Sequence, residues 1–239
     1  MGAVRNGKTL LRTKLVTVLN QMRSVGDDAP LHDIERERQR QALISTAQFV
    51  DEHLSHAEPE PGADVLEAKL NLLRRAVDMA PAEGLILEFG VATGLTLREI
   101  AARRLPAHGF DSFEGLPEYW RAGFGAGSFS QGVPDVGGAN LHVGLFSDTL
   151  PAFLEEHRDP FAFVHMDADL YSSTKVVFDL ARDRFISGTL ILFDEYFNYP
   201  GWQQHEHRAF SEFIAASGRE FEYIGYNPIG HQVLVLITA

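Results

Sequence analysis

The sequence predicts an α/β fold with a mostly parallel sheet of seven strands, an antiparallel last strand, and helices on both faces. From residue 85 onward, short apolar runs alternate with amphipathic stretches, which is typical of a parallel sheet covered by helices. Only a short turn near residues 227–230 separates the last two apolar runs. These two runs should pair antiparallel, because a parallel return needs a longer crossover.

The apolar runs define the expected strands, which are residues 85–89, 107–110, 140–143, 162–166, 189–193, 221–226 and 232–237. The amphipathic stretches among them define the expected helices, which are residues 95–104, 149–157, 171–185 and 203–217. Two earlier helices are expected over residues 32–54 and from Leu66 to Met79, with a proline-bearing connector at residues 57–64 between them. We expect residues 1–60 to form an N-terminal helical extension and residues 61–239 to form one larger domain.

Composition excludes several classes of protein. The 33 acidic and 21 basic residues leave a net charge of −12, which disfavours a nucleic-acid partner because the phosphate backbone would be repelled. The chain has no cysteine, so disulfides, thiol catalysis and sulfur-ligated zinc are impossible. No apolar run is long enough for a membrane span, and the start lacks the pattern of a signal peptide. We expect a cytoplasmic protein.

Residues 1–25 carry five basic side chains and no acidic one. This basic arm is expected to pack on the acidic body or on a second subunit, or to be frayed. A contact with an acidic partner or a membrane surface is the alternative. We expect a homo-oligomer, most simply a dimer.

Open parallel sheets bind ligands at the carboxyl ends of their strands, so the residues there carry the functional prediction. The first expected strand ends at Glu88, and Gly90 and Gly94 follow it. Glycine allows a tight turn and a close approach of ligand to backbone, and Glu88 can accept hydrogen bonds from an amine or a hydroxyl. The spacing is neither the dinucleotide fingerprint nor a phosphate loop. A purely structural turn is the alternative.

The next two strand ends fit a nucleoside. Asp111 lies about twenty residues beyond the glycine turn, where an acid suits the two hydroxyls of a ribose. Phe146 can stack on an adenine, while Ser147 or Asp148 bonds the amino edge of that ring. The alternative is that Ser147 or Asp148 is the N-cap of the following helix.

Acidic side chains follow the fourth and fifth expected strands. Asp167 and Asp194 end neighbouring strands at one edge, and Glu195 lies beside Asp194. Such a concentration of carboxylates is costly without a cation, and oxygen ligands favour magnesium or calcium. The alternative is that one or two of these acids bond backbone amides. Asp169 is a further candidate, or else it caps the helix that begins near Tyr171.

Two residues are candidates for the proton acceptor of a reaction at this edge, Asp169 and His205. His205 follows the fifth strand and can act as a general base or close the pocket, whereas a surface histidine is the alternative. His165 lies within a strand and is expected to be a satisfied core histidine. Residues 117–138 are rich in glycine and aromatic residues without regular periodicity, which is typical of a lid or specificity loop.

Several motifs together resemble the macrocin O-methyltransferase (TylF-like) family over roughly residues 65–238. They are residues 109–118 (GFDSFEGLPE), 148–151 (DTLP), 165–174 (HMDADLYSST) and 193–196 (FDEY). The Glu-x-Gly-x-x-x-Gly turn at residues 88–94 resembles motif I of class I S-adenosylmethionine methyltransferases. The resemblance implies a Rossmann-like class I methyltransferase fold, S-adenosylmethionine as cofactor, and magnesium-assisted methylation of sugar hydroxyls in natural products.

A more distant likeness is to catechol O-methyltransferase. It implies that Asp167 is a metal acid, that Asp194 and Glu195 match an acid–amide pair, and that Phe146 and Ser147 contact the adenine. Two departures stand out. Glu195 stands where many relatives have Asp or Asn, and Leu170 stands where the catechol enzyme has its catalytic lysine.

We therefore expect an O-methyltransferase acting on a hydroxyl of a small molecule, with no nucleic-acid partner. The expected metal ligands for Mg²⁺ are Asp167, Asp194 and Glu195, and the expected proton acceptor is Asp169 or His205. The residues expected to bind S-adenosylmethionine are Glu88, Gly90, Thr93, Gly94, Thr96, Asp111, Ser112, Phe146, Ser147 and Asp167.

Two other functions fit parts of the pattern. Asp167 and Asp169 have the Asp-x-Asp spacing by which many glycosyltransferases hold a nucleotide-sugar through a metal. A non-catalytic nucleotide-binding protein, with the first 60 residues making a subunit interface, is the third possibility.

Overall fold

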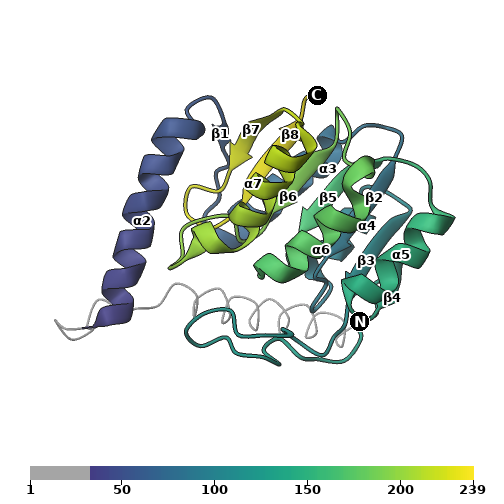
Figure 1. Cartoon of the computed structure of the whole chain (residues 1–239), viewed down its shortest axis with the longest axis horizontal. Coiled ribbons are helices and arrows are strands. Elements are labelled where there is room, and N and C mark those ends of the chain that lie inside the picture. The colour runs from purple at the N-terminus through teal and green to yellow at the C-terminus, as the bar shows by residue number, and fades with distance from the viewer. Residues whose placement is uncertain (1–32) are drawn as a thin grey trace.

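The computed structural model describes residues 33–239, so the basic arm expected at residues 1–25 lies outside the described part. Eight strands form one sheet in the order β1-β7-β8-β6-β5-β2-β3-β4, and every pair is parallel except those made by β8 (Figure 1). The prediction of a mostly parallel sheet with an antiparallel last strand is confirmed. The strands are β1 (Glu58–Pro59), β2 (Leu85–Phe89), β3 (Ala107–Asp111), β4 (Ala139–Val143), β5 (Phe161–Met166), β6 (Leu190–Phe193), β7 (Phe221–Tyr226) and β8 (Val233–Ile237).

Helices cover both faces of this sheet, with α5, α6 and α7 on one face and α3 and α4 on the other (Figure 1). The helices are α2 (Ile34–His53), α3 (Val65–Met79), α4 (Leu95–Ala101), α5 (Phe146–Glu156), α6 (Tyr171–Ala181) and α7 (Glu206–Ser217), with short 3-10 turns η1 (Arg182–Arg184) and η2 (Trp202–Gln204). Alternate strand residues feed two cores: Leu87 and Phe89 pack toward α5–α7, and Ile86 packs toward α3 and α4. This alternation is the expected consequence of strand geometry.

Several details differ from the sequence prediction. The helices expected over residues 95–104 and 171–185 end earlier, at Ala101 and Ala181. The connector contains β1, a two-residue strand that pairs with β7 and makes an eighth strand. Helix α5 begins at Phe146, three residues earlier than expected. The last expected helix is broken at His205, where the backbone leaves the helical region between η2 and α7. Short elements of this kind depend on tertiary contacts more than on local pattern.

Helix α2 lies at the β1–β7 end of the sheet, apart from the other helices (Figure 1). Asp33 caps it by accepting bonds from two backbone amides of its first turn. Phe49 packs its ring against Trp202 and Tyr223, with centroids 5.3 and 5.7 Å away. Within residues 33–239, no helix has the length and apolarity needed to cross a membrane.

The strand register places the candidate residues level with one another. Asp167 donates its amide to the carbonyl of Phe89, and Asp194 donates its amide to the carbonyl of Met166, both at 2.8 Å. The carboxyl ends of β2, β5 and β6 therefore meet at one edge. Gly90 turns the chain there with φ +90°, and any side chain at this position would collide with the Asp167 carbonyl oxygen.

We expect Gly90→Ala to lower the free energy of unfolding by about 2 kcal/mol more than Gly123→Ala, because overpacking adds to a similar backbone strain. Gly123 is the matched control: its φ is +86°, and a Cβ there meets nothing within 4 Å. Urea unfolding of both variants measures the difference. Equal losses would show that the close approach at Gly90 is not a packing constraint.

Candidate active site

A cavity of about 470 Å³ opens at the carboxyl ends of the central strands. Its walls come from the β2–α4 turn, the end of β3, the first turn of α5, the ends of β5 and β6, and part of the long β3–β4 loop. Ten of the predicted site residues line it, namely Gly90, Thr93, Asp111, Ser112, Phe146, Ser147, Asp167, Asp169, Asp194 and Glu195. The nucleoside and carboxylate halves of the predicted site thus share one space.

Four predicted residues do not line the cavity. Glu88 is fully buried, and its Oε1 is 2.7 Å from His165 Nδ1, so the protein itself engages this carboxylate. Gly94 starts α4 with φ +73° and faces Val136, and Thr96 is buried in α4. His205 lies beyond the cavity wall beside Trp120 and Tyr199, with ring centroids 6.5 and 6.0 Å away.

Asp111 holds the glycine turn in place. Its Oδ2 accepts the amides of Val91 and Ala92, both at 2.8 Å, and its Oδ1 accepts the amide of Phe113 at 2.7 Å. Each carboxylate oxygen has two lone pairs, so these bonds leave capacity for a ligand in the cavity. Asp111 therefore ties the end of β3 to the turn after β2 while it lines the space.

Phe146 and Ser147 lie in the first turn of α5, at the edge of the cavity. The N-cap of this helix is Leu145, without a side-chain capping bond, so the alternative in which Ser147 or Asp148 is the cap is wrong. Instead, Ser147 Oγ donates to Asp148 Oδ1 at 2.9 Å. Phe146 stands edge-on to Phe89, with centroids 5.3 Å apart, and its ring position is set by that contact.

The carboxylates at the ends of β5 and β6 surround a buried lysine that the sequence prediction did not include. Lys69 Nζ, on α3, lies 2.5 Å from Asp194 Oδ2 and 3.4 Å from Asp167 Oδ2. Burial lowers the pKa of Lys69, but the charges of Asp167 and Asp194 outweigh it and raise that pKa overall. Lys69 is therefore an ammonium ion inside the site.

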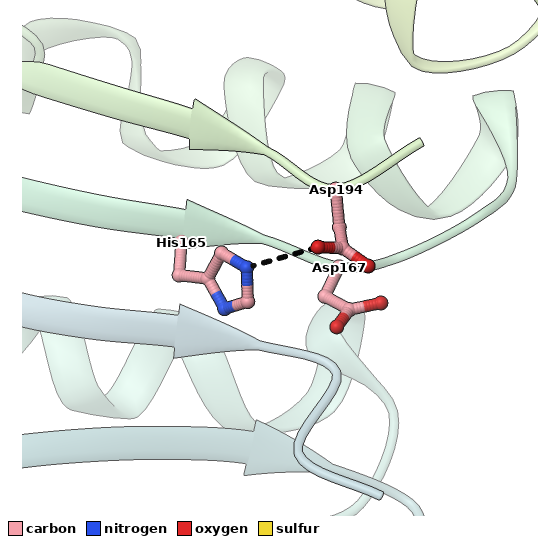
Figure 2. Close-up of side chains that lie close together, drawn as sticks. All are labelled: His165, Asp167 and Asp194. Atoms are coloured by element: carbon pink, nitrogen blue, oxygen red, sulfur yellow. Dashed lines mark ion pairs between the residues drawn. The ribbon is translucent and has the colours of Figure 1, made fainter. Parts of the chain in front are cut away.

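His165 bridges two acids beneath the cavity. Its Nδ1 lies 2.7 Å from Glu88 Oε1, and its Nε2 lies 3.6 Å from Asp194 Oδ1. Figure 2 shows the ion pair between His165 and Asp194, with Asp167 beside them. Burial lowers the pKa of His165, yet the neighbouring acids Asp194 and Glu88 raise it to about 10. The expectation of a core histidine is confirmed by this burial, but the histidine is only partly satisfied, because Nε2 has no hydrogen-bond partner among the described residues.

Burial and mutual repulsion act on the remaining acids. Burial raises the pKa of Asp167 to about 6, with Asp194 adding to the effect. Burial and neighbouring carboxylates also raise the pKa of Asp169 and of Glu195 well above their ordinary values. Glu195 Oε2 is buried, without a partner among the described residues. An added cation would relieve this repulsion.

Two groups of side chains among residues 33–239 could share such a cation. The inner group is His165, Asp167 and Asp194, and the outer group is Asp167, Asp169 and Glu195. Within each group, one ligand atom from every residue lies within 4.8 Å of the others. The outer group offers only oxygen ligands, and with the orphaned Glu195 Oε2 it fits a hard cation such as Mg²⁺.

Asp169 holds an unusual backbone conformation, with φ +60°. It does not cap α6, because the N-cap of that helix is Leu170, without a side-chain bond. Strained backbone of this kind occurs where the surrounding structure fixes a side chain in a functional site. Asp169 is 8% exposed and lines the cavity.

The prediction from the sequence did not include three residues of this region, which are Lys69, Arg121 and Glu206. Lys69 does carry a signal, because it falls on the apolar stripe of α3 between Leu66 and Leu73. Arg121 stacks on the Trp120 ring, 4.1 Å from its centroid, within a loop that has no periodicity. Glu206 accepts the amides of Ala168 and Glu195, a role that only tertiary contact reveals.

Residues 87–196 match a family model described as a methyltransferase domain (Methyltransf_24). This segment is therefore similar to a methyltransferase domain. The match begins in β2 and ends just after β6, so it includes the glycine turn, Asp111 and the carboxylates, while Lys69 and His205 lie outside it. A comparison of the sequence with curated proteins gives no match.

Solved structures show the same fold. A crystal structure of CalS11, described as a calicheamicin methyltransferase, has a TM-score of 0.59 and 22% identity, covering 90% of this chain and 96% of that one. A second, apo structure of CalS11, described as a TDP-rhamnose 3'-O-methyltransferase, has a TM-score of 0.52 and 22% identity, with coverages of 90% and 98%. The O-methyltransferase NovP has a TM-score of 0.53 and 19% identity, with coverages of 86% and 100%. The described part of the chain therefore has the Rossmann-like fold of these structures.

Replacement of Asp111 tests its hold on the glycine turn. In Asp111→Asn, the side-chain NH₂ group must face at least one backbone N–H, and two donors cannot form a hydrogen bond. We therefore expect the unfolding free energy of the ligand-free protein to fall by about 1–3 kcal/mol. The control is Asp179→Asn, which removes an exposed ion pair with Lys175 and should cost less than about 1 kcal/mol. A thermal or urea unfolding series measures both. If Asp111→Asn costs no more than the control, Asp111 does not support the turn.

Proposed function

We propose that the chain is an S-adenosylmethionine-dependent O-methyltransferase of the macrocin O-methyltransferase (TylF-like) kind, which methylates a hydroxyl of a small molecule, a sugar or another natural product, with Mg²⁺. One observation carries the proposal: a single cavity joins the turn at Gly90, Asp111 and Phe146 to the carboxylates Asp167 and Glu195. The methyltransferase domain and the sugar O-methylation named for one structural neighbour support it.

The nucleoside half of the cavity would hold the methyl donor. Gly90 leaves room beside the backbone, Asp111 offers the remaining lone pair of Oδ1 to a ribose hydroxyl, and Phe146 offers a ring to the adenine. Thr93, Ser112 and Ser147 add hydroxyl groups along the same wall. The anchoring of Asp111 and Phe146 by Val91, Ala92 and Phe89 fixes these groups before any ligand arrives.

The carboxylate half would receive the acceptor hydroxyl. Asp167 and Glu195, with Asp194 or Asp169, would hold Mg²⁺, which when bound lowers the pKa of a hydroxyl and orients it. Asp169 would take the hydroxyl proton, since it lines the cavity beside Asp167 and burial raises its pKa, which makes the carboxylate a stronger base. The new carbon–oxygen bond forms as the carbon–sulfur bond of the sulfonium breaks, and the electron pair of that bond stays on sulfur.

A methyl-transfer screen tests this function directly. We expect transfer of a labelled methyl group from S-adenosylmethionine to sugar-bearing acceptors in the presence of Mg²⁺, and loss of transfer on chelation. Calorimetry should show that the demethylated product of S-adenosylmethionine binds with and without chelator, because its expected contacts with Asp111 and Phe146 do not involve the metal. The proposal fails if neither form of the cofactor binds, and stabilisation by a nucleotide-sugar with manganese would favour glycosyl transfer instead.

The two candidate bases are separable by substitution. We expect Asp169→Asn to lower kcat by about a hundredfold or more with little change in cofactor binding, because it removes the proton acceptor and Asn tolerates a positive φ. His205→Gln should change kcat by less than threefold, since His205 lies outside the cavity. Steady-state kinetics on both variants provide the comparison. The reverse ranking would assign proton transfer to His205.

A further inference from the structure

Asp194 is already satisfied by the chain's own donors. Its Oδ2 accepts a hydrogen bond from the Lys69 ammonium at 2.5 Å, and its Oδ1 accepts one from Gln232 Nε2 at 3.2 Å. His165 Nε2 forms an ion pair with the same Oδ1 at 3.6 Å. Asp194 is 2% exposed, although it lines the cavity, so its bonds to these donors are buried. A divalent ion on Asp194 would have to displace Lys69 or approach it closely.

Lys69 is held in that place by the fold. It is 5% exposed and projects from the face of α3 that buries Leu66, Leu72 and Leu73. An ammonium ion beside Asp167 and Asp194 has the same sign of charge as a metal ion. It attracts these carboxylates and repels a metal ion, and both effects are strongest in a buried site. The inner group therefore contains its own cation.

Glu195 is in the opposite situation. It is also 2% exposed, yet its Oε2 has no partner among residues 33–239, and the nearest members of its group are Asp167 and Asp169. The outer group thus has buried oxygen ligands that the Lys69 ammonium approaches less closely: Lys69 Nζ lies 3.4 Å from Asp167 Oδ2, against 2.5 Å from Asp194 Oδ2. The Arg121 guanidinium also acts on Asp169 and Glu195 through its charge. A carboxylate has two oxygens, so Asp169 can contact an ion with one and receive a proton on the other.

We propose that Lys69 is a built-in cation that satisfies Asp194 and confines a divalent metal ion to the outer group, Asp167, Asp169 and Glu195. Lys69 is then a positioning residue that selects which carboxylates bind metal, and Asp194 is not a metal ligand. This inference rests on the metal site of the proposed function. It differs from the ligand set Asp167, Asp194 and Glu195 that the sequence predicts.

Mn²⁺ binding to the full chain, measured by calorimetry without S-adenosylmethionine or acceptor, tests the inference. Lys69→Met removes the ammonium with little change in volume and frees Asp194, so we expect Mn²⁺ to bind at least fivefold more tightly or with a second equivalent. The double variant Lys69→Met/Asp194→Asn removes the pair without a net charge change and should bind Mn²⁺ within threefold of wild type. Glu195→Gln should weaken binding at least tenfold.

Lys69→Arg is the conservative control, because it keeps a cation beside Asp194 and should bind Mn²⁺ as wild type does. Thermal midpoints of all variants show which are folded, and the double variant and Lys69→Arg keep the test open if Lys69→Met unfolds. A tenfold loss in the double variant, or unchanged binding by folded Lys69→Met, overturns the inference. If wild type binds no Mn²⁺ but Lys69→Met does, the metal part of the proposed function fails while the role of Lys69 stands; if neither binds, both fail.

Discussion

Repulsion among buried carboxylates is the constraint on which the rest of this site depends. The parallel register of β5 and β6 brings Asp167 and Asp194 to one edge, and the strand ends carry Asp169 and Glu195 to the same place. In a medium of low polarity such charges cannot all remain ionised without cations. Lys69 and His165 neutralise the inner part, and this leaves the outer part charged, protonated or bound to metal.

The other half of the site depends on a different constraint, the close approach of two strand ends. Gly90 passes directly over the backbone of Asp167, and Asp111 fastens that turn from the neighbouring strand. The same contacts that stabilise the turn place it against the carboxylates. A methyl donor held by the turn would therefore lie next to an acceptor held by the acids, and this adjacency is what methyl transfer requires.

Most strands could be predicted because each is a short, continuous apolar run that is buried on both faces, and the glycine turn and the acids follow from their positions at strand ends. Strand β1 was not predicted, because a strand of two residues shows no hydrophobic periodicity. The start of α5 at Phe146 was missed because it has no capping side chain to mark it. Lys69 was missed although it interrupts an apolar stripe, because its partners lie about a hundred residues away in the chain.

The sequence by itself determined the class of fold, the edge of the sheet at which the candidate residues lie, and an oxygen-rich cluster without sulfur ligands. These properties depend on hydrophobic period, residue type and the order of the elements. Only the tertiary structure decided which side chains share that edge: it brought Lys69 from α3 between two acids and left Glu88 and His205 outside the cavity. The physical reason is that charge pairing and burial are set by packing between distant segments, which a local pattern does not record.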